Sequence, residues 1–112
     1  MSVKNITSSF ELDNLIRFGG KVVVQYFNPA QPDEENSVAL FELYAMETDI
    51  EFVRMNPQRV QDAAQRAGFV NFPAYEAYHG GAKVDQYVPS PGAVSQNDPQ
   101  LNAFIERLRD RA

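Results

Sequence analysis

The sequence contains no cysteine among its 112 residues. Without a thiol the chain has no disulfide framework, no thiolate metal site and no cysteine nucleophile. Thiol–disulfide exchange is also excluded, because it requires a thiolate to attack a sulfur atom. This absence removes a whole class of chemistry before any fold is considered.

Basic clusters, histidine and long apolar runs are scarce as well. The net charge is −5, and Lys and Arg cluster first at Arg107, Arg109 and Arg111, near the end of a predicted helix where cations suit the helix dipole. No apolar run approaches the roughly 20 residues that span a bilayer, and the first residues lack the apolar segment of a signal peptide. We therefore expect a cytoplasmic protein that binds neither nucleic acid nor a membrane.

What is present is typical of one compact domain. Hydrophobic residues make up 44% of the chain and charged residues 22%, both close to globular averages. A chain of this length can bury a real core, and no linker or internal repeat interrupts it. We predict a single domain over residues 1–112.

Hydrophobic periodicity and capping signals predict the element order β-α-β-α-β-α-β-β-α. Ser8 with Glu11 forms a capping box, and the continuous apolar run over 21–27 is typical of a central strand. The glycines after His79 predict a β-hairpin. The predicted apolar faces of the first two helices are Phe10, Leu12, Leu15, Ile16 and Phe18, and Val38, Leu40, Phe41, Leu43, Tyr44 and Met46.

Four segments resemble the thioredoxin family in order and spacing. They are the strand Val22–Phe27, the Gly68-Phe69-Val70 end of an Ala-rich helix, the Phe72-Pro73-Ala74 motif before a strand, and the turn Gly80-Gly81-Ala82-Lys83. The resemblance covers residues 3–108. It implies an α/β thioredoxin fold, with a central mixed sheet of about five strands flanked by four helices.

The same resemblance shows where the family's redox site has been lost. Aligned without gaps from Lys21, the family's Cys-Gly-Pro-Cys falls on Gln31, Pro32, Asp33 and Glu34. Ala30 takes the tryptophan position, and Gln25 takes the position of the buried acid that assists thiol deprotonation. A register shifted by one residue, with Pro32 and Glu35 at the cysteine positions, stays open, and neither register restores a thiol.

The resemblance also implies a groove in which partner peptides lie extended. Its residues would be Ala30, Gln31, Pro32, Phe72, Pro73 and Pro89, with Pro73 as the family's cis-proline. Phe72 either lines this groove or turns inward as core. The Pro89–Asp98 segment is longer than the family's turn, so it either flanks the groove or is a tolerated insertion.

No metal or cofactor site is predicted. Asp33, Glu34 and Glu35 are consecutive, and adjacent helical positions diverge by about 100°, so they suit the positive end of a helix better than a shared ion. The leading hypothesis is a redox-inactive, thioredoxin-like module that binds a protein or an extended peptide. The alternatives are a non-thiol enzyme on the same fold and a structural subunit of a complex.

Overall fold

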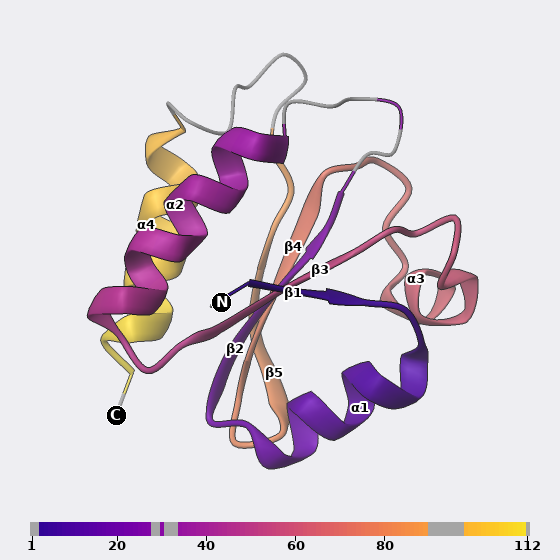
Figure 1. Ribbon diagram of the computed structural model, residues 1–112, viewed down its shortest axis with the longest axis horizontal. Helices are drawn as coiled ribbons and strands as arrows, with labels where there is room; N and C mark the ends of the chain where they lie inside the picture. The colour runs from indigo at the N-terminus through magenta and orange to yellow at the C-terminus, as the bar shows by residue number, and fades with distance from the viewer. Residues whose placement is uncertain (1–2, 28–29, 31–33, 90–97, 112) are drawn as a thin grey trace.

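The computed structural model contains one mixed β-sheet with helices on both faces (Figure 1). The structure describes residues 3–27, 30, 34–89 and 98–111, with residues 34–37 described by their backbone alone. Within these residues the elements follow the predicted order. They are β1 (Val3–Ile6), α1 (Ser9–Phe18), β2 (Lys21–Tyr26), α2 (Glu34–Glu47), β3 (Glu51–Met55), α3 (Gln61–Ala67), β4 (Ala74–His79), β5 (Ala82–Tyr87) and α4 (Pro99–Arg109).

The sheet has the strand order β1-β3-β2-β4-β5. Strands β1 and β2 both run parallel to β3, whereas β4 is antiparallel to β2 and to β5. Strand β2 is buried from Val22 to Tyr26, as its continuous apolar run predicts for a strand covered on both faces. The described helices include none that is long and apolar enough to cross a membrane.

Local signals fix the ends of several elements. The Glu11 backbone N–H donates to Ser8 Oγ (3.1 Å), and Glu11 Oε1 accepts from the Thr7 N–H (3.2 Å), one residue earlier than in a standard capping box. Gly80 and Gly81 both have positive φ (64° and 88°), which a two-residue hairpin turn of type I′ requires. The hairpin between β4 and β5 therefore forms where the glycine pair predicts it.

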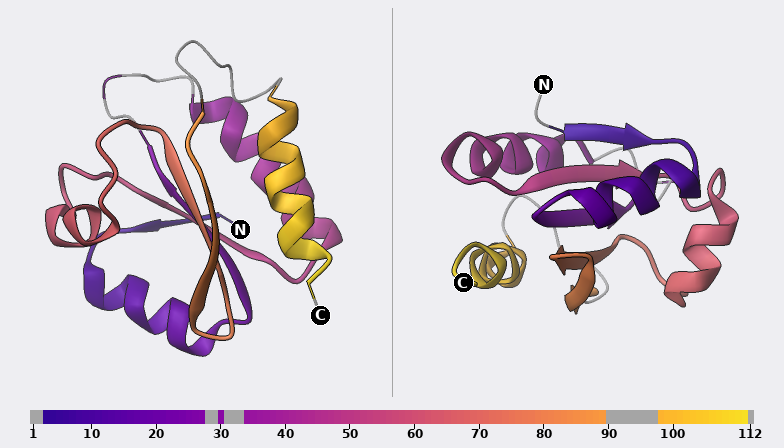
Figure 2. Two further views of the ribbon diagram at one scale, coloured as in Figure 1. Left: turned by 180° about the vertical axis from the view of Figure 1, so that it is seen from behind. Right: turned by 90° about the horizontal axis from the view of Figure 1, so that it is seen from below.

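Two apolar clusters hold the helices to the two faces of the sheet (Figure 2). Helices α2 and α4 lie side by side over one face, where Phe41 and Phe104 pack with Phe52 and Tyr75. Helices α1 and α3 cover the other face, α1 through Leu12 and α3 through the alanines Ala63 and Ala64. Helix α4 packs through one apolar face, on which Leu101, Phe104, Ile105 and Leu108 are all buried.

Part of the predicted faces of α1 and α2 is wrong. Phe10 and Phe18 are 75% and 77% exposed, and Leu43 and Met46 on α2 are also exposed. At about 100° per residue, Phe10 and Phe18 are separated from Leu12 by roughly 160° and 120° around the helix. The buried face of α1 is therefore the narrower stripe of Leu12, Leu15 and Ile16.

Candidate functional site

Four connecting segments meet at one end of the sheet. Tyr26, the last residue of β2, lies opposite both Met55 at the end of β3 and Ala74 at the start of β4. Tyr75 lies opposite Tyr87 at the end of β5. The segments that follow β2, β3 and β5 therefore lie at the same end of the sheet as the segment that precedes β4. This is the upper end in Figure 1.

A pocket of about 320 Å³ opens at this end, between Ala30, α3 and the segment before β4. Its apolar lining comes from Ala30, Pro57, Ala64, Phe69 and Phe72, and its polar lining from Gln58, Gln61 and Gln65. No charged side chain is among these described lining residues. The pocket suits an uncharged group that presents both apolar surface and hydrogen-bonding atoms.

Phe72 combines the two orientations that the sequence left open. Its side chain is half-buried and packs against the apolar cluster under α1 and α3. It also forms part of the pocket wall, with Ala30 among the other lining residues. The Phe72–Pro73 peptide bond is cis.

The other predicted groove residues are placed less directly. Pro73 and Pro89 are half-buried at the same end of the sheet, and neither lines the described pocket. Glu34 is the first residue of α2. Gln31, Pro32 and Asp33 lie outside the described residues, as does the interior of the Pro89–Asp98 segment, so the register of the degenerate motif stays a prediction.

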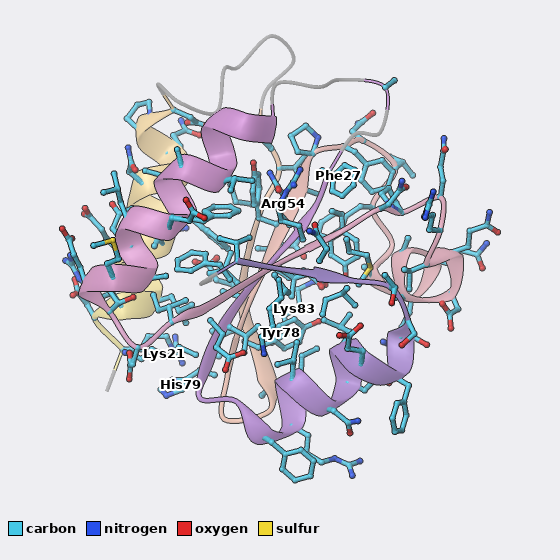
Figure 3. All side chains as sticks on the ribbon, viewed as in Figure 1. Lys21, Phe27, Arg54, Tyr78, His79 and Lys83 are labelled. Atoms are coloured by element: carbon cyan, nitrogen blue, oxygen red, sulfur yellow. The ribbon has the colours of Figure 1, made fainter. Side chains whose placement is uncertain are left out.

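Gln25 is fully buried in β2, on the face covered by α2 and α4. Its Nε2 donates to the Tyr75 hydroxyl (3.2 Å), and its Oε1 accepts from Arg54 Nε (2.8 Å). The Arg54 guanidinium also lies over the Phe27 ring, 4.6 Å from its centroid (Figure 3). The neutral side-chain amide of Gln25 therefore donates one hydrogen bond and accepts another, at a position where the resemblance implies an acid.

Sequence reasoning missed the glutamines of the pocket. Gln58, Gln61 and Gln65 are spaced three and four residues apart, so they lie along one side of α3 and its leading turn. All three are exposed. Their helical spacing was visible in the sequence, but nothing in the spacing shows that this side of α3 faces a pocket.

A second polar cluster lies on the opposite face of the sheet from Gln25. The Glu76 carboxylate is 2% exposed and accepts hydrogen bonds from the hydroxyls of Tyr26 (2.7 Å) and Tyr78 (3.0 Å). Lys83 Nζ lies 3.1 Å from Glu76 Oε2, and Figure 3 shows Lys83 beside Tyr78. Together with Arg66, these four side chains border a pocket of about 210 Å³.

Burial is the main cause that raises the pKa of the Tyr26 and Tyr78 hydroxyls, and the nearby Glu76 carboxylate raises it further. Both phenols therefore keep their protons and stay hydrogen-bond donors. The Glu76 oxygens receive donors from within the protein, which is typical of a structural network. Among the described residues, no group of three or more His, Cys, Asp or Glu side chains could hold a metal ion.

The raised tyrosine pKa values predict a loss of stability in alkali. A phenol whose pKa is higher in the folded state than its ordinary value of about 10 makes the folded protein bind more protons above pH 10. Its stabilisation is complete below pH 10 and is lost as the pH rises toward the folded-state pKa. The free energy of unfolding should fall by up to about 1.4 kcal/mol per pH unit for each such tyrosine.

Urea denaturation between pH 8 and pH 11 measures this slope. Lysines also titrate near the top of this range, so the informative comparison is between wild type and Tyr26→Phe. The variant lacks one titrating phenol and should show a shallower decline above pH 10. An unchanged slope would contradict the assignment to Tyr26.

No protein-family model and no curated protein matches the sequence. Solved structures do match it over almost its whole length. A mutant thioredoxin from Halobacterium salinarum matches with a TM-score of 0.81 and 17% identity, covering 99% of this chain and 94% of that one. Plasmodium falciparum thioredoxin matches with a TM-score of 0.76 and 22% identity, covering 93% and 97%.

Mitochondrial thioredoxin 3 from Saccharomyces cerevisiae gives a similar result, with a TM-score of 0.76, 19% identity and 95% coverage of both chains. This chain is therefore an α/β protein with a five-stranded mixed sheet between two pairs of helices. More specifically, it has the thioredoxin fold and lacks the cysteines of a Cys-Gly-Pro-Cys motif.

Proposed function

We propose that this protein is a redox-inactive thioredoxin-fold module that binds a protein partner through an uncharged, extended peptide segment. The observation that carries the proposal is the 320 Å³ pocket, which has Ala30 and Phe72, two of the predicted groove residues, in its wall. A concave, mostly apolar site with a few polar groups is the usual form of a binding pocket.

The chemistry of the lining supports a peptide ligand. Phe69 and Phe72 offer aromatic surface to an apolar side chain. Gln58, Gln61 and Gln65 carry amides that both donate and accept, so they can hydrogen-bond the N–H and C=O groups of an extended backbone. A charged segment would be desolvated here without an opposite charge from the described lining residues.

Redox inactivity follows from chemistry, because a chain without cysteine has no thiolate to attack a disulfide. A non-thiol enzyme would need a polar pocket, and the Glu76 cluster borders one. Its phenols, however, donate to Glu76 and hold their protons tightly, which favours a structural role over proton transfer.

Selection from a library of random peptides tests the proposal. We expect wild type to select sequences with an apolar residue in an uncharged context. Phe72→Asp should lower the affinity for the selected peptides by at least about tenfold, because a buried anchor contact is replaced by a carboxylate. Leu43→Asp, on the exposed side of α2, is the matched control and should bind within about twofold of wild type.

Because Phe72 also packs on the core, a second variant keeps the test independent of folding. Gln65→Ala changes an exposed pocket residue and should weaken binding severalfold with an unchanged circular dichroism spectrum. Selected peptides that bind wild type, Phe72→Asp and Gln65→Ala equally would move binding away from this pocket. Reduction of a disulfide substrate faster than in buffer would contradict redox inactivity.

A further inference from the structure

Helix α1 carries a stripe of side chains that takes no part in either core. Phe10, Asn14 and Phe18 are spaced four residues apart, so they follow one another along the helix. The two phenylalanine rings are about three-quarters exposed. This stripe forms one wall of a groove of about 420 Å³, and Lys4 of β1 and Glu51 of β3 line its other side.

Glu51, which lines the groove, has a carboxylate oxygen that receives no donor from the described residues. Glu51 Oε2 is buried, and it has no hydrogen-bond partner among the described residues. Glu51 shares a face of β3 with Val53 and Met55, which lie in the cluster under α1 and α3. A buried carboxylate oxygen left unpaired is unfavourable, so a donor that enters the groove would stabilise it.

We infer that this α1 groove binds an arginine side chain presented by a partner protein. The guanidinium donates to Glu51, and its planar face stacks on the exposed ring of Phe18, at the end of α1 that adjoins Gly19. Arginine suits both contacts because its fork of N–H groups matches a carboxylate and its delocalised cation is attracted to aromatic faces.

The charges around the groove support a cation over other ligands. Glu11 and Glu51 border it and would repel an anion, and the chain as a whole carries a net charge of −5. A purely apolar ligand would leave Glu51 Oε2 without a donor.

Two cations of the chain itself oppose the ligand. Lys4 lines the groove, and the Arg17 guanidinium lies 5.9 Å from the centroid of the Phe18 ring, which also lines it. Neither provides a hydrogen bond to the Glu51 oxygen. Removing Lys4 should therefore strengthen arginine binding, whereas removing the Glu51 charge should weaken it, and these opposite effects distinguish the proposal from a general loss of structure.

This inference is independent of the proposed peptide pocket. The α1 groove includes Gly19, two residues before β2 begins, and Glu51, the first residue of β3. The Ala30–Phe72 pocket lies beyond the opposite ends of these two parallel strands. Phe72→Asp should leave arginine binding unchanged, so each proposal can fail while the other stands.

Titration with the blocked tripeptide acetyl-Gly-Arg-Gly-amide, followed by two-dimensional amide NMR, tests the inference. The peptide should shift the amide signals of Phe18 and Glu51 with a dissociation constant on the order of millimolar, as expected for one small ligand group. The matched peptide with norleucine should bind about tenfold more weakly, since it offers no donor and no charge.

Three variants complete the experiment. Glu51→Gln should weaken arginine binding by at least about fivefold, and Lys4→Ala should strengthen it by about twofold. Phe18→Ser changes an exposed ring, so it leaves the core intact and should also weaken binding. Equal binding of the arginine and norleucine peptides, no signal change in the groove, or full binding by Glu51→Gln and Phe18→Ser would overturn the inference.

Discussion

Phe41→Ala should lower the free energy of unfolding by about 3–5 kcal/mol. Phe41 is fully buried on α2, in the cluster that joins α2 and α4 to the sheet. Its ring stacks on Phe52 with 4.9 Å between centroids and meets Tyr75 edge-on at 6.2 Å. Truncation therefore removes apolar contacts, ends two aromatic pairs and leaves a cavity between three elements.

Urea denaturation followed by circular dichroism measures the effect as a shift in the midpoint at an unchanged slope. Met46→Ala on the same helix is the control, because Met46 is 80% exposed and its truncation should change stability by no more than about 0.5 kcal/mol. Domains of this size are stable by about 5–15 kcal/mol, so Phe41→Ala would remove a large share. A loss below 1 kcal/mol would contradict the packing described for α2.

The fold was largely predictable because its signals are local. The apolar run of β2, the Ser8 cap and the glycines of the hairpin each specify a short piece of backbone without reference to the rest of the chain. The family resemblance then implied one mixed sheet of about five strands flanked by four helices, which no local pattern contains. The observed order β1-β3-β2-β4-β5 agrees with that fold.

The buried faces of α1 and α2 were less predictable. Both helices carry apolar residues around more than half of their circumference, so periodicity alone does not show which residues meet the sheet. Phe10 and Met46 are as apolar as their buried neighbours and are nevertheless exposed. The rotation of each helix about its axis is set by packing against strands that are far away in the sequence. The sequence of the helix itself does not contain this information.

The candidate site also has residues that the sequence predicted and residues that it did not. Ala30 and Phe72 were identified because the resemblance assigns roles to their positions, and both line the observed pocket. Gln61 and Gln65 have no such assignment. The Glu76 cluster was not visible at all, because Tyr26 and Glu76 are separated by 50 residues and meet only through the antiparallel register of β2 and β4.

That cluster gives the second large expected effect. Glu76→Ala should lower the free energy of unfolding by about 3 kcal/mol, because it leaves buried donors without an acceptor. The Tyr26 phenol is almost fully buried and loses the partner at 2.7 Å. Lys83 is about one-third exposed, so its ammonium can be solvated when Glu76 is removed. The loss of stability is therefore at the lower end of the range for a broken buried ion pair.

Matched variants separate the hydrogen bonds from the charge. Glu76→Gln keeps a carbonyl oxygen for the phenols and loses only the ion pair with Lys83, so it should be destabilised by about 1–2 kcal/mol. Asp85→Asn on β5, which breaks the more exposed pair with Arg107 of α4, should change stability by about 0.5 kcal/mol or less. If Glu76→Ala were no less stable than Asp85→Asn, the hydrogen-bonded network around Glu76 would not stabilise the fold, since the two variants would then report the same weak surface electrostatics.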